Sequence, residues 1–233
     1  MLRKEAIQNL LYFDVETAAL YPTLETMYKE NYRLYHLWMK REEYYRGAYP
    51  ALADMDSLSI YKQKAGLEPE FSRVVCVSFG TFTEDGDQKY VSFSGNDEKE
   101  ILNKANKVFN NAMAKGWKLC GHNIKGFDVP CLGKRMIYNG INPSGNLQIW
   151  DKKPWEVPYM DTSDIFAFGS WMHQKYLSLD LLTCSLDIDS PKDDMDGSKV
   201  NDVFWIDKDF EKIELYCESD VRAVMTVMEK ICF

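Results

Sequence analysis

The 233-residue chain has no apolar run that approaches the roughly 18 residues of a membrane-spanning helix. Its first residues, MLRKEAIQNLLYFDVET, also have no apolar segment followed by small residues, as a secretory signal peptide would have. On these grounds we expect a soluble, cytoplasmic protein that does not associate with membranes.

The chain also lacks paired cysteines and an excess of basic charge. Its six cysteines are widely spaced, and none belongs to a Cys-x-x-Cys pair suited to zinc or redox chemistry, so we expect buried, reduced thiols. The 36 acidic residues outnumber the 28 basic ones, leaving a formal net charge of -8. This balance argues against binding nucleic acid mainly by counterion release, but it fits carboxylates gathered around metal ions.

The order of apolar segments predicts a single α/β domain whose first strand lies in the centre of the sheet. Strands are expected at 9–15, 73–82, 89–94 and 117–120. Helices are expected at 21–49, 97–115, 131–138, 178–186 and 209–232, with loops at 142–160 and 190–201. The tyrosine-rich helix at 21–49 begins a mainly helical insert at approximately 21–70, whose aromatic residues fit either a nucleic-acid or partner surface or packing on the core.

Two acids, Asp14 and Glu16, lie at the end of the first predicted strand, in the sequence NLLYFDVET. In an extended backbone residues two apart project from the same face, so the two carboxylates repel each other unless cations lie between them. Asp-x-Glu is also common on solvated surfaces. Its place next to an apolar, central strand favours a functional site, because uncompensated charge there is costly.

A second acid-bearing segment, GHNIKGFDVPCL, follows the predicted strand at 117–120. Asp128 fits either a helix N-cap or a second contribution to a site at the same sheet edge as Asp14. His122 and Asn123 either brace the turn or contact a substrate, and Lys125 either reaches a phosphate or is solvated. On the last predicted helix, Tyr216 and Asp220 are four residues apart and share one face.

In this order the three segments resemble the three exonuclease motifs of the DEDD superfamily, tyrosine subgroup: Asp-x-Glu, then Asn-x-x-x-Phe-Asp, then Tyr-x-x-x-Asp on the terminal helix. The resemblance spans nearly the whole chain. The segments KQKAGLEPEFSRVVCVSFG, YLSLDLL, DGSKV and YCESDV narrow it to the predicted exonucleases related to the proofreading domain of family B DNA polymerases. It implies a ribonuclease-H-like fold, with a mixed central sheet flanked by helices, and a metal-dependent 3′–5′ exonuclease.

The resemblance also implies residue roles. Asp14 would bridge two Mg²⁺ or Mn²⁺ ions, Glu16 and Asp220 would complete one metal site, and Asp128 would help to hold the other. Tyr216 would position the attacking water, since a phenol is a poor base at neutral pH. The implied substrate is the 3′ end of single-stranded DNA, in replication, repair or proofreading, with a polymerase or replisome component as a possible partner.

Further residues are candidate substrate contacts: Thr17, Leu20, Asn123, Lys125 and Phe127. Leu20 and Phe127 fit core packing as well as contact with a base. The remaining acids that drew attention are expected to be helix caps or solvated loop charges; they are Asp161, Asp164, Asp180, Asp193, Asp194 and Asp196.

Three other readings of the sequence remain open. A 3′–5′ RNA exonuclease would carry the same motifs, which do not detect the 2′-hydroxyl. A catalytically silent nucleic-acid-binding or replisome-docking module on this scaffold would normally lack one of the acids, and all four are present. A ribonuclease-H-like endonuclease or integrase would share the sheet and the acids but not the terminal Tyr-x-x-x-Asp helix.

Overall fold

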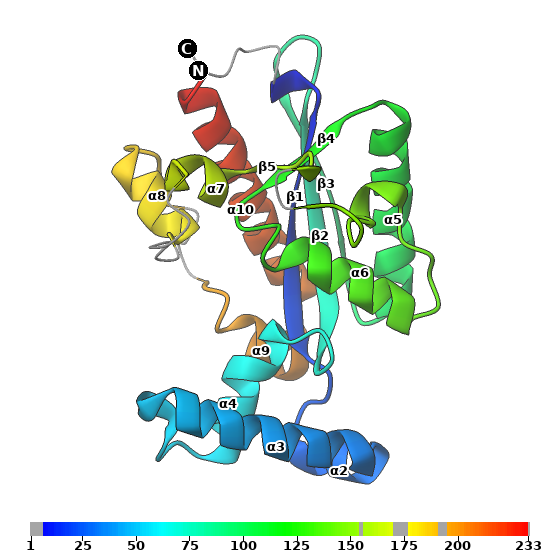
Figure 1. Ribbon diagram of the computed structural model, residues 1–233, viewed down its shortest axis with the longest axis vertical. Helices are drawn as coiled ribbons and strands as arrows, with labels where there is room; N and C mark the ends of the chain where they lie inside the picture. Colours follow the sequence, from blue (N-terminus) through cyan, green and yellow to red (C-terminus); the bar gives the residue numbers. More distant parts are fainter. Residues whose placement is uncertain (1–6, 154–155, 170–176, 191–194, 233) are drawn as a thin grey trace.

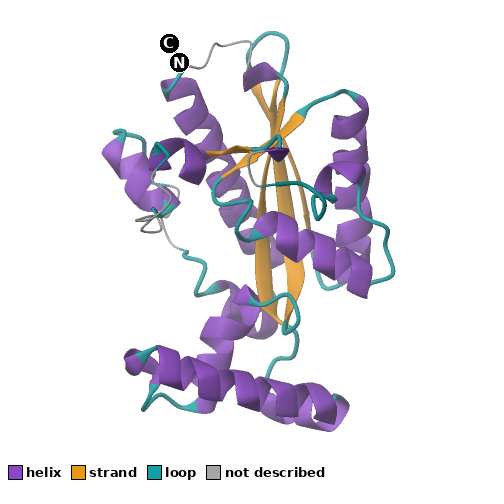
Figure 2. Ribbon diagram, in the orientation of Figure 1, coloured by secondary structure: helices purple, strands orange, loops and turns teal. Residues whose placement is uncertain are grey.

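The computed structural model describes residues 7–153, 156–169, 177–190 and 195–232. One mixed sheet runs through the protein in the strand order β3-β2-β1-β4-β5, and helices cover both of its faces (Figures 1 and 2). Its strands are β1 (Leu10–Ala19), β2 (Ser72–Phe82), β3 (Gln88–Ser94), β4 (Lys118–Gly121) and β5 (Met160–Asp161). β1 is antiparallel to β2 and parallel to β4. The predicted central position of the first strand is thus confirmed.

The principal helices are α2 (Leu24–Glu30), α3 (Tyr32–Ala48), α4 (Ser57–Lys64), α5 (Glu98–Ala114), α6 (Asp128–Tyr138), α7 (Thr162–Ala167), α8 (Leu179–Ser185), α9 (Val200–Asp202) and α10 (Phe210–Lys230). Short turns of 3₁₀-helix lie at Pro50–Leu52, Ala65–Leu67 and Gly145–Leu147, and a π-helical turn lies at Val203–Asp207. Within the described ranges, no helix combines the length and the apolar character that crossing a membrane requires.

The two faces of β1 pack against different helices. Leu11, Phe13 and Val15 belong to a core cluster that includes residues of α5 and α6. Leu10 and Tyr12, which alternate with them, pack against α10. Because side chains alternate along a strand, the residues that follow Tyr12 at every second position also project towards α10.

The insert between β1 and β2 is helical, as the sequence predicts, and it has a core of its own. Trp38 is fully buried and meets the rings of Tyr61 and Phe71 edge-on, at centroid distances of 5.0 and 5.1 Å. Asn31 divides the predicted single helix into α2 and α3, because its side chain accepts a hydrogen bond from Leu34 N and caps α3.

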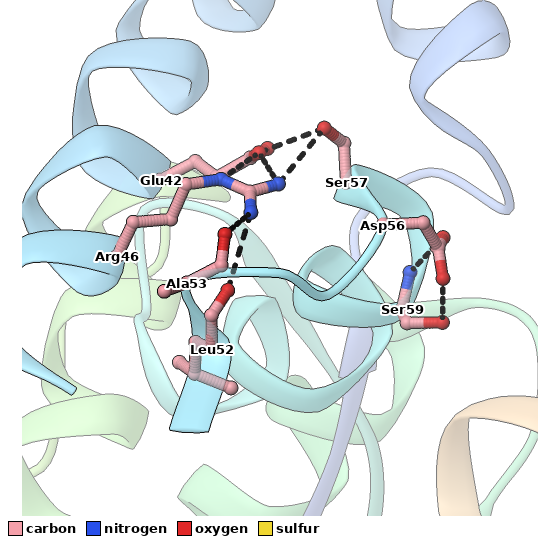
Figure 3. Close-up of polar contacts among 7 residues, drawn as sticks. All are labelled: Glu42, Arg46, Leu52, Ala53, Asp56, Ser57 and Ser59. Carbon is pink, nitrogen blue, oxygen red and sulfur yellow. Dashed lines mark hydrogen bonds and ion pairs between the residues drawn. The ribbon is translucent and has the colours of Figure 1, made fainter. Parts of the chain in front are cut away.

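A partly buried ion pair within α3, between Glu42 and Arg46, contacts the start of α4 (Figure 3). Glu42, which is 3% exposed, accepts hydrogen bonds from Arg46 at 2.7 Å and from Ser57 Oγ at 2.7 Å. The same guanidinium donates to the backbone oxygens of Leu52 and Ala53, in the turn that leads to α4. The position of α4 therefore depends on polar contacts as well as on the aromatic core.

Several predicted boundaries were wrong. The two-residue strand β5 lies in the segment 142–160 and just beyond it, which was expected to be a loop. The end of the predicted loop at 190–201 forms part of α9. All six cysteines are free, as expected, but Cys184 is exposed and Cys232 is only partly buried.

Candidate active site

Asp14 and Glu16 lie in the middle of β1, whereas the sequence placed them at the end of a strand. β1 continues to Ala19 because residues 17–19 still pair with β2, after a register shift between Glu16 and Thr17. By the alternation of the strand, both acids project from the α10 face, in line with Tyr12. Two carboxylates therefore lie on a strand that is covered on both faces.

β4 is short, and its early end leaves an edge of β1 open beside these acids. The parallel pairing between the two strands stops at Tyr12 and Cys120. The chain then passes close to β1 at Gly121, where a Cβ atom would lie 2.8 Å from a backbone oxygen of that strand. Asp128 reaches the open edge: it is 4% exposed, and its carboxylate is hydrogen-bonded to the backbone of Val15.

Asp128 is the first residue of α6 rather than its N-cap. The cap position belongs to Phe127, whose side chain makes no capping hydrogen bond. A carboxylate in the first turn is favoured by the helix dipole. Because the carboxylate of Asp128 also contacts β1, the helix N-terminus and the central strand jointly fix its position.

α10 completes the group from the other side. Tyr216 is 8% exposed, and the charge of Asp220, one turn later, acts on its phenol. Cys217 donates from its thiol to the backbone oxygen and to the carboxylate of Asp14, at 3.4 and 3.5 Å. Ligand atoms of Asp14, Glu16 and Cys217 all lie within 4.8 Å of one another. Tyr216 and Asp220 thus share a helical face, as predicted, and that face is turned towards β1.

The charges of the neighbouring carboxylates affect the ionisation of Asp14, Glu16 and Asp128. Burial, and then the charge of Asp128, raises the pKa of Asp14 to about 8. Burial, and then the charges of Asp14 and Asp220, raises the pKa of Glu16 well above its usual value. Burial also raises the pKa of Asp128 to about 8, with smaller contributions from the charges of Asp161 and Asp220. Glu16 and Asp128 are buried, whereas Asp14 and Asp220 are partly buried. The protein thus gathers negative charge where water screens it poorly, and a bound cation would relieve this repulsion.

The chemistry of the donors fits a hard divalent cation. Burial raises the pKa of the Cys217 thiol well above its usual value, so the thiol stays protonated and acts as a hydrogen-bond donor. The available ligands are then carboxylate oxygens, which suit Mg²⁺ or Mn²⁺. Burial, and then the charge of Asp220, also raises the pKa of Tyr216, which keeps the phenol neutral.

The sequence pointed to Cys217 only as a buried thiol. The signal that could have found it is its spacing, since it directly follows Tyr216 and is three residues before Asp220 on the same helix.

Asp161 contributes in a way that the sequence did not indicate. It caps α7 by accepting a hydrogen bond from Ser163 N, as one of the expectations allowed. It is also 2% exposed and accepts hydrogen bonds from Asn123 N at 2.7 Å and from Lys125 N at 3.0 Å. One buried carboxylate therefore holds the loop that leads to Asp128, including Asn123 with its positive φ of 58°.

The candidate substrate contacts have several different settings. Thr17 is partly buried, and its hydroxyl donates to Gly66 O of the insert at 2.7 Å. Leu20 is also partly buried, next to the insert. Lys125 pairs with Asp164 at 2.7 Å.

Packing and turn-bracing account for two residues of the β4–α6 loop. Phe127 packs at the margin of the core cluster beneath α5 and α6. His122 makes hydrogen bonds to Thr162 Oγ1 and to Leu177 O, at 2.8 and 2.7 Å, so it braces the turn. Of the remaining acids, Asp180 accepts a hydrogen bond from Ser190. Asp196 accepts one from Ser198 N, and Asp193 and Asp194 lie outside the described residues.

Comparison with known proteins identifies both a family and a fold. Residues 66–231 match a family described as a "predicted 3'-5' exonuclease related to the exonuclease domain of PolB". A comparison with curated proteins finds no match. Among solved structures, the family B DNA polymerase of the hyperthermophilic archaeon Pyrobaculum calidifontis is similar over 95% of this chain, with a TM-score of 0.56 and 15% sequence identity.

This chain covers 24% of that polymerase, and the low identity makes the likeness one of fold. The fold is the ribonuclease-H-like arrangement expected from the sequence, with a mixed sheet between helices.

Proposed function

Because the chain belongs to the family of predicted 3′–5′ exonucleases related to the exonuclease domain of PolB, we propose that it removes nucleotides from the 3′ end of single-stranded DNA. The observation that carries this proposal is the group of four acids, Asp14, Glu16, Asp128 and Asp220, which lie between β1, α6 and α10 and whose charges help to raise the pKa values of Asp14, Glu16 and Asp128. Such a group is costly unless it binds cations.

In this proposal the four acids hold two divalent ions, Mg²⁺ or Mn²⁺. Asp14 would serve both ions, Glu16 and Asp220 would complete one site, and Asp128 would help to hold the other. Bound in pairs, such ions acidify a water molecule and neutralise the charge that develops on a phosphodiester during hydrolysis.

Tyr216 acts on the attacking water as a positioning group. Because its pKa is raised, it does not take up a proton from the water as a phenolate would. Its oxygen can accept a hydrogen bond from the water and so align it with the phosphorus. Cys217 holds the Asp14 carboxylate in place from the same helix.

The biological setting we propose is DNA replication, repair or proofreading, with a polymerase or replisome component as a partner. The similarity in fold to a family B DNA polymerase supports this setting.

The decisive experiment uses 5′-labelled single-stranded DNA with Mg²⁺ or Mn²⁺, beside RNA of the same sequence. We expect a ladder that shortens from the 3′ end, with DNA degraded faster. Asp14→Ala and Asp220→Ala should abolish the ladder, and Tyr216→Phe should lower kcat by about 100-fold. Asp207→Ala, which removes an exposed acid shortly before α10, is the charge-matched control and should leave the ladder unchanged.

A ladder that persists in the Asp14→Ala protein would contradict the proposed metal site. Faster degradation of RNA would replace DNA with RNA as the substrate. Binding of DNA without any hydrolysis would favour a catalytically silent module.

A further inference from the structure

A polar groove of about 380 Å³ lies between the insert and the segment that precedes α10. One side belongs to α4 and the other to residues 198–202; α4 and α9 lie near the lower end of β1 in Figure 1. Its lining residues are Ser59, Lys62, Gln63, Lys64, Ser198 and Asp202. None of these residues has a role in the metal site proposed above.

The α4 side of the groove is connected by hydrogen bonds to β1, the strand that carries Asp14 and Glu16. α4 continues directly into the 3₁₀ turn at Ala65–Leu67. Within that turn, Gly66 O accepts the hydrogen bond from Thr17, the residue after Glu16. Tyr61, also on α4, receives a hydrogen bond from Tyr21 N at 3.1 Å.

The opposite side of the groove, at residues 198–202, contacts the region of the candidate site at two points. A Cβ atom on Gly197 would lie 3.9 Å from the phenol oxygen of Tyr216, so the chain at Ser198 lies beside the proposed water-positioning group. Asn201 accepts a hydrogen bond from Ala19 N at 3.1 Å. On both sides of the groove, lining residues thus lie within two positions of a residue that contacts β1 or Tyr216.

The charges in the groove differ from those of the site. Lys62 on α4 pairs with Asp202 on the opposite side at 2.8 Å. The ammonium of Lys64 lies 5.3 Å from the centroid of the Tyr49 ring, and in the part of the chain that the structure describes no carboxylate forms an ion pair with it. A protein with a net charge of -8 thus presents two lysines at the margin of a cluster of acids.

We infer that this groove holds the phosphates of the nucleic-acid strand a few nucleotides away from the 3′ end, with Lys64 and Lys62 as phosphate contacts. The inference rests on the proposed function, because the groove matters only if a strand reaches the four acids. Lysine is a compact charge that pairs with phosphate irrespective of the base. Asp202 opposes binding by neutralising Lys62 and by repelling phosphate.

Because Lys64 and Asp202 carry opposite charges, their substitutions should change the Kd for the strand in opposite directions. Binding of a 5′-fluorescein ten-nucleotide oligothymidylate is measured by fluorescence anisotropy in EDTA, where hydrolysis does not interfere. We expect Lys64→Gln to raise Kd by about fivefold and to make the dependence of log Kd on log salt shallower by about 0.7. Asp202→Asn should lower Kd by about twofold, an improvement that a misfolded variant would not give.

Lys104→Gln is the matched control. Lys104 lies on α5, away from the insert. It pairs with Glu100, as Lys62 pairs with Asp202, and its ammonium lies over the Phe93 ring, as that of Lys64 lies over the Tyr49 ring. Its substitution removes the same charge and should leave Kd unchanged. If Lys64→Gln and Asp202→Asn change Kd no more than this control does, the groove does not bind the strand.

A second measurement separates the groove from the metal site. With Mg²⁺, the ratio of kcat/KM for the oligonucleotide to kcat/KM for the p-nitrophenyl ester of thymidine 5′-monophosphate should fall about fivefold in Lys64→Gln. The ester has no further nucleotides to reach the groove. An unchanged ratio overturns the inference and leaves the nuclease intact. Failure of the wild type to hydrolyse either substrate overturns the proposed function, while the anisotropy experiment still decides whether the groove binds nucleic acid.

Discussion

Asp161 and Asp164 both contact Lys125, but they do so in different ways. Asp161 is buried and accepts hydrogen bonds from the backbone N–H groups of Asn123, Lys125 and Ser163. Asp164 is about half exposed and pairs with the side-chain ammonium of Lys125. The first contact fixes the loop that carries Asp128, whereas the second is a surface ion pair of small energetic value.

We expect Asp161→Asn to lower the free energy of unfolding by about 1–3 kcal/mol, because an amide NH₂ would face a backbone N–H that needs an acceptor. Urea unfolding measures this change. The same substitution should weaken Mg²⁺ binding, since the loop before Asp128 loses a fixed point. Asp164→Asn is the control and should change stability by no more than about 0.5 kcal/mol. Equal effects of the two substitutions would show that Asp161 does not brace the loop.

The pairing of Asp161 with this loop could not be predicted from the sequence. The donors at 123 and 125 lie 38 and 36 residues away along the chain, and no local pattern records them. Asp14, Glu16, Asp128 and Asp220 could be selected, because each follows an apolar segment or lies at helical spacing. What selected them as a group was their order along the chain.

At the scale of elements, the short β4 makes room for the site, and Gly121 permits it. A Cβ atom at this position would lie 2.3 Å from Ile124 Cγ2 and 2.8 Å from the backbone oxygen of Phe13. Gly133, on α6, has nothing within 4 Å of such an atom. Within this strand-loop-helix unit there is therefore no room for a methyl group at Gly121, whereas there is room for one at Gly133.

We expect Gly121→Ala to lower the free energy of unfolding by about 1–3 kcal/mol, because the β4–α6 loop must move away from β1. Gly133→Ala should raise it by about 0.5–1 kcal/mol, since alanine restricts the unfolded chain and favours the helix. Thermal or urea unfolding of both variants tests this pair. A destabilisation in both would mean that the close approach at Gly121 has no special role.

The elements that could be predicted from the sequence are those whose apolar residues repeat at a clear helical spacing. α5 and α10 repeat apolar residues at helical spacing, and their observed bounds differ from the prediction by one or two residues. The two-residue strand β5 has too little sequence for any period to appear. The last four residues of β1 were missed because Glu16 and Thr17 resemble the start of a loop, whereas pairing with β2 keeps them in the sheet.

At the scale of the whole molecule, the buried acids make stability depend on pH and on metal ions. In the unfolded chain Asp14 ionises near 3.8, whereas in the folded protein its pKa is about 8. The metal-free folded state therefore binds more protons than the unfolded state between these values. The stabilising effect of protonation is complete below pH 4 and is lost as the pH rises through 8. Divalent ions bind the ionised carboxylates, so the stabilisation that they give should increase as the pH rises.

In EDTA we therefore expect the free energy of unfolding to fall by about 5 kcal/mol from pH 6 to pH 9, the sum of about 2.7 kcal/mol for each of two groups with pKa values near 8. This corresponds to a fall in Tm of about 10–20 °C, measured by circular dichroism. Millimolar Mg²⁺ should raise Tm more at pH 9 than at pH 6, because more of the carboxylates are then ionised.

Asp14→Asn should reduce both effects, since it removes one titrating group and one metal ligand while leaving an acceptor for Cys217. Asp207→Asn, at an exposed acid, should leave both unchanged. A metal-free Tm that does not fall between pH 6 and pH 9 would mean that these acids ionise normally, and that repulsion among them does not prepare the site for cations.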